Sequence, residues 1–301
     1  MDEPVVTTTS LTQYPLVSRG KVRDIYELSP TTLLFIATDR ISAYDVILAN
    51  GIPGKGRLLT QLSTFWFSLL ATKLPDLQTH LLTPDLPSSL PPAQAAALRG
   101  RTLQVRRLRV LPLESIVRGY LAGSAWAEYR RSGTVHGAAM RPGLRECERL
   151  DAPLWTPSTK AEQGAHDENI SAERAAEIVG ARYAERVRER SLAVYEVACA
   201  FAAERGIIIA DTKFEFGVDE ETDEVVLIDE VLTPDSSRFW DAAKYEVGRS
   251  QESLDKQFLR DWLTKEGLKG KEGVSMTDEV VKRTRDGYIE AYERLTGQKW
   301  V

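Results

Sequence analysis

Apolar and polar positions along the first third of the chain predict two strands and then a helix. Residues 22–28 are rich in β-branched and aromatic side chains, a Ser-Pro turn follows at 29–30, and a continuous apolar run occupies 33–37. Strand-forming residues on both sides of a turn signal are typical of a strand–turn–strand unit. After the glycine-rich segment 51–56, apolar residues recur at helical spacing, at positions 58, 62, 65, 66, 69 and 70.

The pattern becomes irregular after this helix and then returns to strands. The five prolines between 74 and 100 predict a surface excursion with one short alanine-rich helix. Strand signals resume at 102–110 and at 113–118, and a helix is expected from about 121 to 131, where Gly133 should end it. These segments predict that the chain alternates between strands and single helices.

The second half contains a long loop, a long helix and a hairpin. Residues 132–170 show little periodicity and are expected to form a loop. Ser171 is a plausible N-cap for the longest helix, which should run to Gly206. Residues 206–217 and 224–230 predict an antiparallel hairpin with a polar turn near 221. Two further helices are expected near the C-terminus, at 253–266 and from a Thr277 cap to about 295.

The hairpin carries an unusual row of charges. Because side chains alternate faces along a strand, Asp211, Lys213 and Glu215 share one face. Antiparallel pairing around a turn near 221 brings Asp229 close to Glu215. Two facing carboxylates need a cation, and Mg²⁺ binds well to one or two carboxylates together with phosphates and water. An ion-pair ladder on an exposed hairpin explains the pattern equally well.

Two other segments resemble anion sites. Residues 18–24 place a glycine among basic side chains at a strand end, and 118–124 place an arginine, two glycines and a serine at a strand-to-helix junction. Glu114 and Arg118 share one face of a strand. Tight turns and a cross-strand ion pair are the simpler structural explanations. Neither a P-loop nor a dinucleotide-binding glycine motif occurs in the chain.

Composition narrows the classes of function. The chain has 301 residues, and 39 basic against 44 acidic side chains give a net charge of −5, which argues against general binding to nucleic acid. Two cysteines and three histidines make a disulfide framework or a zinc centre improbable. No apolar run reaches the ~18 residues of a membrane span, and the start is too acidic for a signal peptide. We therefore expect a cytoplasmic protein with no membrane partner.

Seven segments, taken together and in order, resemble the motifs of the SAICAR synthetase family of purine biosynthesis. The similarity runs from about residue 15 to the C-terminus and is strongest to the longer, single-function form found in fungi. Two departures from the shorter bacterial pattern are Arg23 in place of a lysine and one additional residue between 229 and 238. The matching segments are 20–24 (GKVRD), 39–45 (DRISAYD), 117–124 (VRGYLAGS), 157–164 (PSTKAEQG), 166–169 (HDEN), 211–217 (DTKFEFG) and 229–238 (DEVLTPDSSR).

This resemblance implies a ligase that joins the carboxylate of 4-carboxy-5-aminoimidazole ribonucleotide to the amine of L-aspartate through an acyl phosphate, with ATP and Mg²⁺. It also implies an α+β fold of two lobes: a loose tail at 1–13, a β-rich, kinase-like N-terminal lobe at 14–119 and an ATP-grasp-like C-terminal lobe at 120–301. The fungal members imply a monomer. The partners expected are small-molecule substrates only.

The resemblance also assigns residues. Lys213, Asp211, His166 and Asp167 would be catalytic. Glu215 and Asp229 would hold the metal. The ATP site would comprise Gly20, Lys21, Val22, Arg23, Leu108, Val110, Glu114 and Lys160, and the substrate site Asp45, Arg118, Ser124, Asp235 and Arg238.

Two other functions remain open at this point. One is a different ATP-dependent phosphotransferase with a kinase-like lobe, although the chain lacks the H-R-D and D-F-G motifs of protein kinases. The other is a purine-nucleotide-binding protein without catalysis. Such a protein would usually have lost a metal carboxylate or the phosphate-loop lysine, and this chain retains both.

Overall fold

The computed structural model describes residues 4–160 and 168–301 and contains two main sheets, as the α+β prediction requires. The first is antiparallel and includes the predicted strand–turn–strand unit, in which Ile25 pairs with Phe35. Its strands in spatial order are β1 (Leu16–Arg19), β2 (Arg23–Ser29), β3 (Thr32–Ala37), β7 (Thr102–Arg106) and β6 (Leu81–Thr83).

Residues 4–13 form no helix or strand, but they are packed against this sheet rather than loose. The side chains of Thr9 and Leu11 are buried. The Thr9 hydroxyl donates to Asp24 Oδ2 over 2.7 Å, and the Val6 amide donates to Asp39 Oδ2 over 2.7 Å. The expectation of a loose tail therefore does not hold for this part of the N-terminus.

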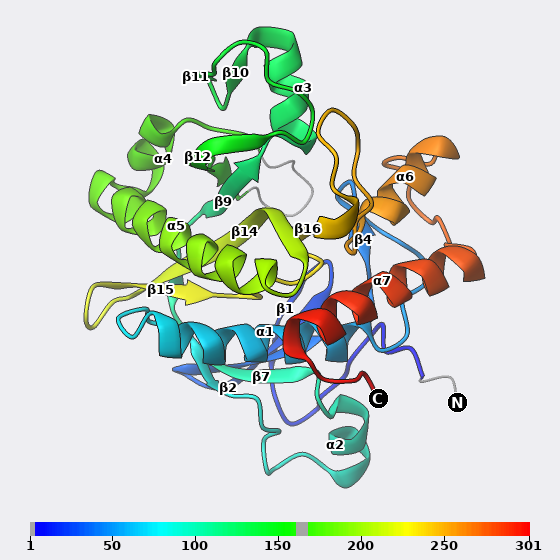
Figure 1. Cartoon of the computed structure of the whole chain (residues 1–301). Helices are drawn as coiled ribbons and strands as arrows, with labels where there is room; N and C mark the ends of the chain where they lie inside the picture. The colour runs from blue at the N-terminus through cyan, green and yellow to red at the C-terminus, as the bar shows by residue number, and fades with distance from the viewer. Residues whose placement is uncertain (1–3, 161–167) are drawn as a thin grey trace.

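The second sheet is built around β14 (Ile207–Asp219), which has neighbours on both sides (Figure 1). The predicted hairpin is present, with Glu215 opposite Ile228 and Asp219 opposite Glu224. A central strand with a buried Glu215 does not fit an exposed ladder of ion pairs. The other strands of this sheet are β8 (Arg109–Val110), β9 (Leu113–Tyr120), β12 (Arg149–Trp155), β13 (Ser158–Thr159), β15 (Glu224–Ile228) and β16 (Ser237–Asp241).

A bulge in β14 turns its charged residues toward one side. Ile209 pairs with Phe239 and Asp211 with Arg238, so Ala210 is an additional residue relative to β16. Before the bulge Ile209 faces the main core, and after it the core residue is Phe214. An extra residue of this kind shifts the alternation of side chains. Asp211, Lys213 and Glu215 consequently lie on the side away from the core, as the alternation predicts.

Helix α1 (Lys55–Lys73) lies between the two sheets (Figure 1). Its apolar side chains, including Leu62 and Trp66, join a core that also contains Phe214 of β14 and Tyr288. The remaining helices are α2 (Pro92–Leu98), α3 (Gly123–Ser132), α4 (Ala172–Val179), α5 (Ala181–Ala203), the 3₁₀ turn η1 (Ala242–Lys244), α6 (Gln257–Lys265) and α7 (Asp278–Thr296); two short hairpins, β4 (Ser42–Ala43) with β5 (Val46–Ile47) and β10 (Thr134–Val135) with β11 (Ala138–Ala139), complete the fold.

Two predictions about the second half need correction. The helix expected from Ser171 to Gly206 is broken at Gly180, whose φ of 92° is unsuited to an α-helix. Residues 149–155, expected to lie in a loop, form β12 because they pair with β9 at the edge of the sheet. The predicted caps are present: Ser171 accepts from the Arg174 amide and Thr277 from the Val280 amide. Among the described helices, none is long and apolar enough to cross a membrane.

Candidate active site

A cleft of about 470 Å³ opens between the turn joining β1 to β2, the charged side of β14 and helix α6. Most of the residues that the sequence analysis selected meet here, although they come from six separate segments of the chain. Those lining the cleft are Gly20, Lys21, Val22, Arg23, Asp45, Glu114, Lys160, Lys213, Glu215, Asp229 and Asp235.

Of the cleft carboxylates Glu114, Glu215 and Asp229, Glu215 is the least exposed. Its side chain is 10% exposed and forms ion pairs with Lys160 and with Lys213, the latter over 3.1 Å. Burial alone would raise the pKa of Glu215, but Lys213 and Lys160 outweigh it and lower the pKa to about 2. Lys213 also donates to Glu114 Oε1 over 2.6 Å. Glu215 is therefore ionised at neutral pH.

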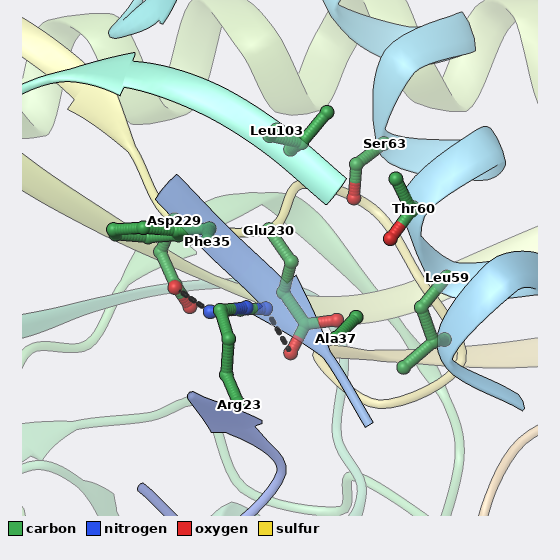
Figure 2. Close-up of a pocket in the computed structure, with 9 residues that line it drawn as sticks. All are labelled: Arg23, Phe35, Ala37, Leu59, Thr60, Ser63, Leu103, Asp229 and Glu230. Carbon is green, nitrogen blue, oxygen red and sulfur yellow. Dashed lines mark hydrogen bonds and ion pairs between the residues drawn. The ribbon is translucent and has the colours of Figure 1, made fainter. Parts of the chain in front are cut away.

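Asp229 lies directly after β15 and is held by Arg23 (Figure 2). The Arg23 guanidinium pairs with Asp229, approaches Glu230 Oε1 to 3.8 Å and lies 5.5 Å from the centroid of the Phe35 ring. Asp229 has a φ of 65°, a left-handed conformation that aspartate tolerates better than most residues. Arg23 thus contacts the predicted metal carboxylate in this structure.

The predicted phosphate turn is tightly constrained. The Gly20 amide donates to the Arg23 carbonyl over 2.8 Å, and Lys21 forms an ion pair with Asp45 across the cleft. Arg40 donates to the carbonyls of Gly20 and Lys21 from behind, over 2.9 and 3.2 Å. With these carbonyls engaged by Arg40, the basic side chains of the turn remain on the cleft side.

A second pocket, of about 220 Å³, adjoins the cleft and is suited to an anion. Asp211 of β14 lies opposite Arg118 on β9 and opposite Arg238 on β16, and it forms ion pairs with both. Arg118 also donates to Ser124 Oγ over 3.3 Å. Two arginines on one aspartate leave a surplus of positive charge. Gly123 allows the close approach of Arg238, because a Cβ at this position would clash with the guanidinium.

Asp235, expected to contact substrate, is instead enclosed by protein partners. Its side chain is 2% exposed. Lys55 Nζ lies 2.7 Å and Lys256 Nζ 3.1 Å from its Oδ2, and the Tyr288 hydroxyl donates to Oδ1 over 2.6 Å. Burial alone would raise the pKa of Asp235, but the two lysines hold it below its usual range. Asp235 thus holds the two lysines together, and it also lines both the cleft and the anion pocket.

The two residues expected at adenine do not line the cleft. Leu108 and Val110 lie at the far end of β14, beside Gly217. His166 and Asp167 lie outside the described residues. Within the described ranges, no group of three or more His, Cys, Asp or Glu side chains is arranged to hold a metal ion.

Four residues that complete the site were not predicted from the sequence: Lys55, Lys256, Arg260 and Tyr288. Lys256 and Arg260 are four residues apart at the start of the helix predicted at 253–266, so a shared helix face was visible in the sequence. Nothing in the sequence related them to Asp235, because the contact depends on the packing of α6 and α7.

Comparisons with known proteins point to one family. A family model described as SAICAR synthetase matches residues 16–277. The phosphoribosylaminoimidazole-succinocarboxamide synthase of Pichia angusta is 58% identical, with 98% of this chain and 99% of the relative covered. A solved structure titled SAICAR-synthase from Saccharomyces cerevisiae complexed SAICAR superposes with a TM-score of 0.89 at 53% identity, covering 98% of this chain and 99% of that one.

A more distant structure, titled SAICAR synthetase (Type-2) in complex with ADP, has a TM-score of 0.71 at 28% identity and covers 94% of this chain and 99% of its own. The family model spans most of the chain, and the identity to fungal relatives extends over almost all of it. On the sequence, the fold and these comparisons together, the chain belongs to the SAICAR synthetase family.

Proposed function

We propose that this protein is an ATP-dependent ligase that forms an amide between the carboxylate of 4-carboxy-5-aminoimidazole ribonucleotide and the amine of L-aspartate. A carboxylate is a poor electrophile, so its oxygen first takes the γ-phosphoryl group of ATP, which releases ADP. The aspartate amine then attacks the carbonyl carbon of the acyl phosphate, and phosphate leaves. Phosphoryl transfer of this kind relies on positioning and charge neutralisation.

The observation that carries the proposal is the continuity of the two pockets along β14. Lys213 lines both the cleft and the anion pocket. A ribonucleotide whose phosphate lies between Arg118 and Arg238 would direct its reacting carboxylate toward Lys213. ATP phosphates bound under the turn at 20–23 approach the same lysine from the other side. In this arrangement Lys213 would stabilise the charge that develops during transfer.

We assign roles to the remaining residues on the same basis. Lys160 neutralises ATP phosphates together with Lys21 and Arg23. Asp211 orients Arg118 and Arg238, and Asp235 positions Lys55 and Lys256; neither has to touch the substrate. Ser124 joins the ribonucleotide phosphate site, and Asp45 faces the substrate across the cleft.

The carboxylates of Glu215 and Asp229 at the cleft suit Mg²⁺. Glu215 and Asp229 provide two oxygen ligands, which matches the preference of Mg²⁺ for one or two carboxylates with the rest of its shell taken from phosphates and water. When bound, the ion would neutralise charge on the β- and γ-phosphates of ATP. Lys160 and Arg23, now paired with these carboxylates, would be freed to contact the phosphates.

We also propose a monomer in the cytoplasm. The arginines, lysines and carboxylates of both pockets come from one chain, and both cysteines, Cys147 and Cys199, are free thiols.

The test is a reconstituted reaction. Purified protein is incubated with ATP, Mg²⁺, the carboxylated ribonucleotide and L-aspartate, each omitted in turn, and ADP and the succinyl adduct are followed by mass spectrometry. Adduct that requires all four components is the expected result. ADP release without adduct would indicate another phosphotransferase, and nucleotide binding without turnover would indicate a non-catalytic protein.

A further inference from the structure

Arg260 of α6 lies where the cleft and the anion pocket meet. Lys213, Asp235 and Arg260 line both cavities. The other cations here are paired: Lys213 with Glu114 and Glu215, and Arg118 and Arg238 with Asp211. The Arg260 guanidinium, by contrast, forms no hydrogen bond or ion pair with any residue in the described ranges 4–160 and 168–301. It is available to a ligand.

The helix that carries Arg260 is firmly anchored. Leu259 and Leu263 of this helix are buried in a core cluster with Ile41, Ile52 and other apolar side chains. The Tyr44 hydroxyl donates to the Arg260 carbonyl over 3.4 Å. Because the helix is fixed, the backbone of Arg260 is already in place at the junction of the two cavities, and only its side chain has to be ordered when a ligand binds.

The surroundings of Arg260 carry a surplus of positive charge. Lys55 and Lys256 share the single carboxylate of Asp235, and Lys256 also lines the cleft. Burial, together with the positive charges of Lys55 and Arg260, lowers the pKa of Lys256, against the opposing effect of Asp235. The other carboxylates that act on this cluster have partners elsewhere. Asp255 is buried and accepts from the Phe239 and Gln257 amides, and Glu230 lies 3.8 Å from Arg23.

Each anionic group of the three substrates can be matched to basic side chains of the two pockets. The ribonucleotide phosphate is matched by Arg118, Ser124 and Arg238, and the ATP phosphates by the turn at 20–23 and Lys160. L-Aspartate brings two further carboxylates. With Lys213 assigned to the reacting carboxylate, the cations that remain among the described lining residues are Arg260 and Lys256. We infer that Arg260, with Lys256 beside it, binds a carboxylate of the aspartate substrate and so selects a dicarboxylic amino acid.

This inference rests on the proposed function and adds the place where the aspartate substrate binds. Arginine binds a carboxylate through two parallel hydrogen bonds, which fixes both the position and the orientation of the ligand. Because Arg260 and Lys213 border the same two cavities, aspartate held at Arg260 presents its amine to the carbonyl activated beside Lys213.

The test compares Arg260→Gln with Lys265→Gln, an exposed lysine of the same helix, in steady-state kinetics with each substrate varied. We expect the KM for aspartate to rise about 10- to 150-fold in Arg260→Gln, the loss of one charged hydrogen-bonded contact of ~1.5–3 kcal/mol. The KM values for ATP and the ribonucleotide should stay within about twofold, and Lys265→Gln should match the wild type. Arg260→Lys should recover part of the loss.

A rise in the KM for the ribonucleotide instead, or an unchanged KM for aspartate, would overturn the inference. Thermal unfolding of each variant shows whether the fold is retained, and if Arg260→Gln does not fold, Arg260→Lys supplies the same comparison of KM values. The two proposals fail separately: a wild-type protein that forms no adduct refutes the reaction, whereas an active wild type with an unaltered Arg260→Gln variant refutes only the role of Arg260.

Discussion

Lys55 and Asp235 are 180 residues apart in the chain, yet Lys55 Nζ lies 2.7 Å from Asp235 Oδ2, and the lysine side chain is fully enclosed. Lys55 opens α1, Asp235 follows β15, and Lys256 and Tyr288 bring α6 and α7 to the same carboxylate. One buried aspartate therefore joins four segments that build one wall of the cleft. Stability and the geometry of the site depend on the same group.

We predict that Asp235→Asn lowers the free energy of unfolding by about 3–5 kcal/mol at pH 7, because two buried lysines lose their shared counter-ion. Urea unfolding measures this directly. Asp286→Asn, which removes one member of an exposed ion pair on α7, is the control and should cost under about 1 kcal/mol. A loss as small as that of the control would show that Asp235 does not stabilise the junction.

The difference in unfolding free energy between wild type and Asp235→Asn should also depend on pH. The pKa of Asp235 in the folded protein lies below its ordinary value of 3.8, so its stabilising effect is complete above that pH and is lost as the pH falls toward the folded-state pKa. The difference in unfolding free energy between wild type and Asp235→Asn should therefore be constant from pH 7 to about 5 and shrink below about pH 4. A difference that grows on acidification would contradict the assignment.

For the anion pocket, we predict that Arg118→Ala weakens binding of the ribonucleotide by at least about 10-fold while ATP binding changes little. The arginine lies 2.7 Å from Asp211 and is 5% exposed, so its loss also releases Asp211 to repel a phosphate. Calorimetric titration with each ligand separates the two affinities. Arg141→Ala, at a half-exposed ion pair, is the matched control. Equal losses for both ligands would argue against a phosphate role.

At the carboxylate-rich end, Asp229→Asn should reduce turnover by orders of magnitude and leave thermal unfolding nearly unchanged. Asparagine tolerates the left-handed φ of 65° at this position, so the backbone is not strained, but it binds Mg²⁺ more weakly than a carboxylate. The Mg²⁺ concentration needed for half-maximal activity should rise, and binding of Mn²⁺ followed by electron paramagnetic resonance should weaken. Normal turnover at ordinary Mg²⁺ would sink the metal assignment.

Gly123→Ala tests the approach of Arg238. A Cβ at Gly123 clashes with the guanidinium, and the φ of 58° adds a strain of about 1 kcal/mol for a non-glycine residue. Because a flexible side chain can move aside, we expect Arg238 to shift, the KM for the ribonucleotide to rise and the melting temperature to fall only slightly. Gly133→Ala, with a similar φ of 71° and open space around it, controls for strain alone.

Local patterns were sufficient to predict most elements and the shared face of Asp211, Lys213 and Glu215, since alternation and capping depend on neighbouring residues. The bulge at Ala210 was not predictable, because it depends on the pairing of β14 with β16. Alternation counted from Ile207 would have placed Asp211 on the core side.

The parts of the site that the sequence did not reveal are contacts between distant elements. Arg23 was expected at ATP phosphates, and its contact with Asp229 joins residues 206 positions apart. Asp235 was recognised as part of a motif, but its enclosure by Lys55, Lys256 and Tyr288 follows from the docking of three helices. Pairing of this kind is set by tertiary packing, which no local pattern encodes.

The segment of β14 between Asp211 and Glu215 has a fixed length, and this length sets how far a ligand must extend to contact both of its ends. Four residues of extended strand span about 13 Å, and they separate the pair of arginines from the carboxylates at the other end. In the proposed binding mode, the ribonucleotide covers the part from the arginines to Lys213. An analogue with a shorter or longer linker, bound at the arginines, would not bring its carboxylate to Lys213, so we expect substrates to be distinguished by their dimensions as well as by their charges.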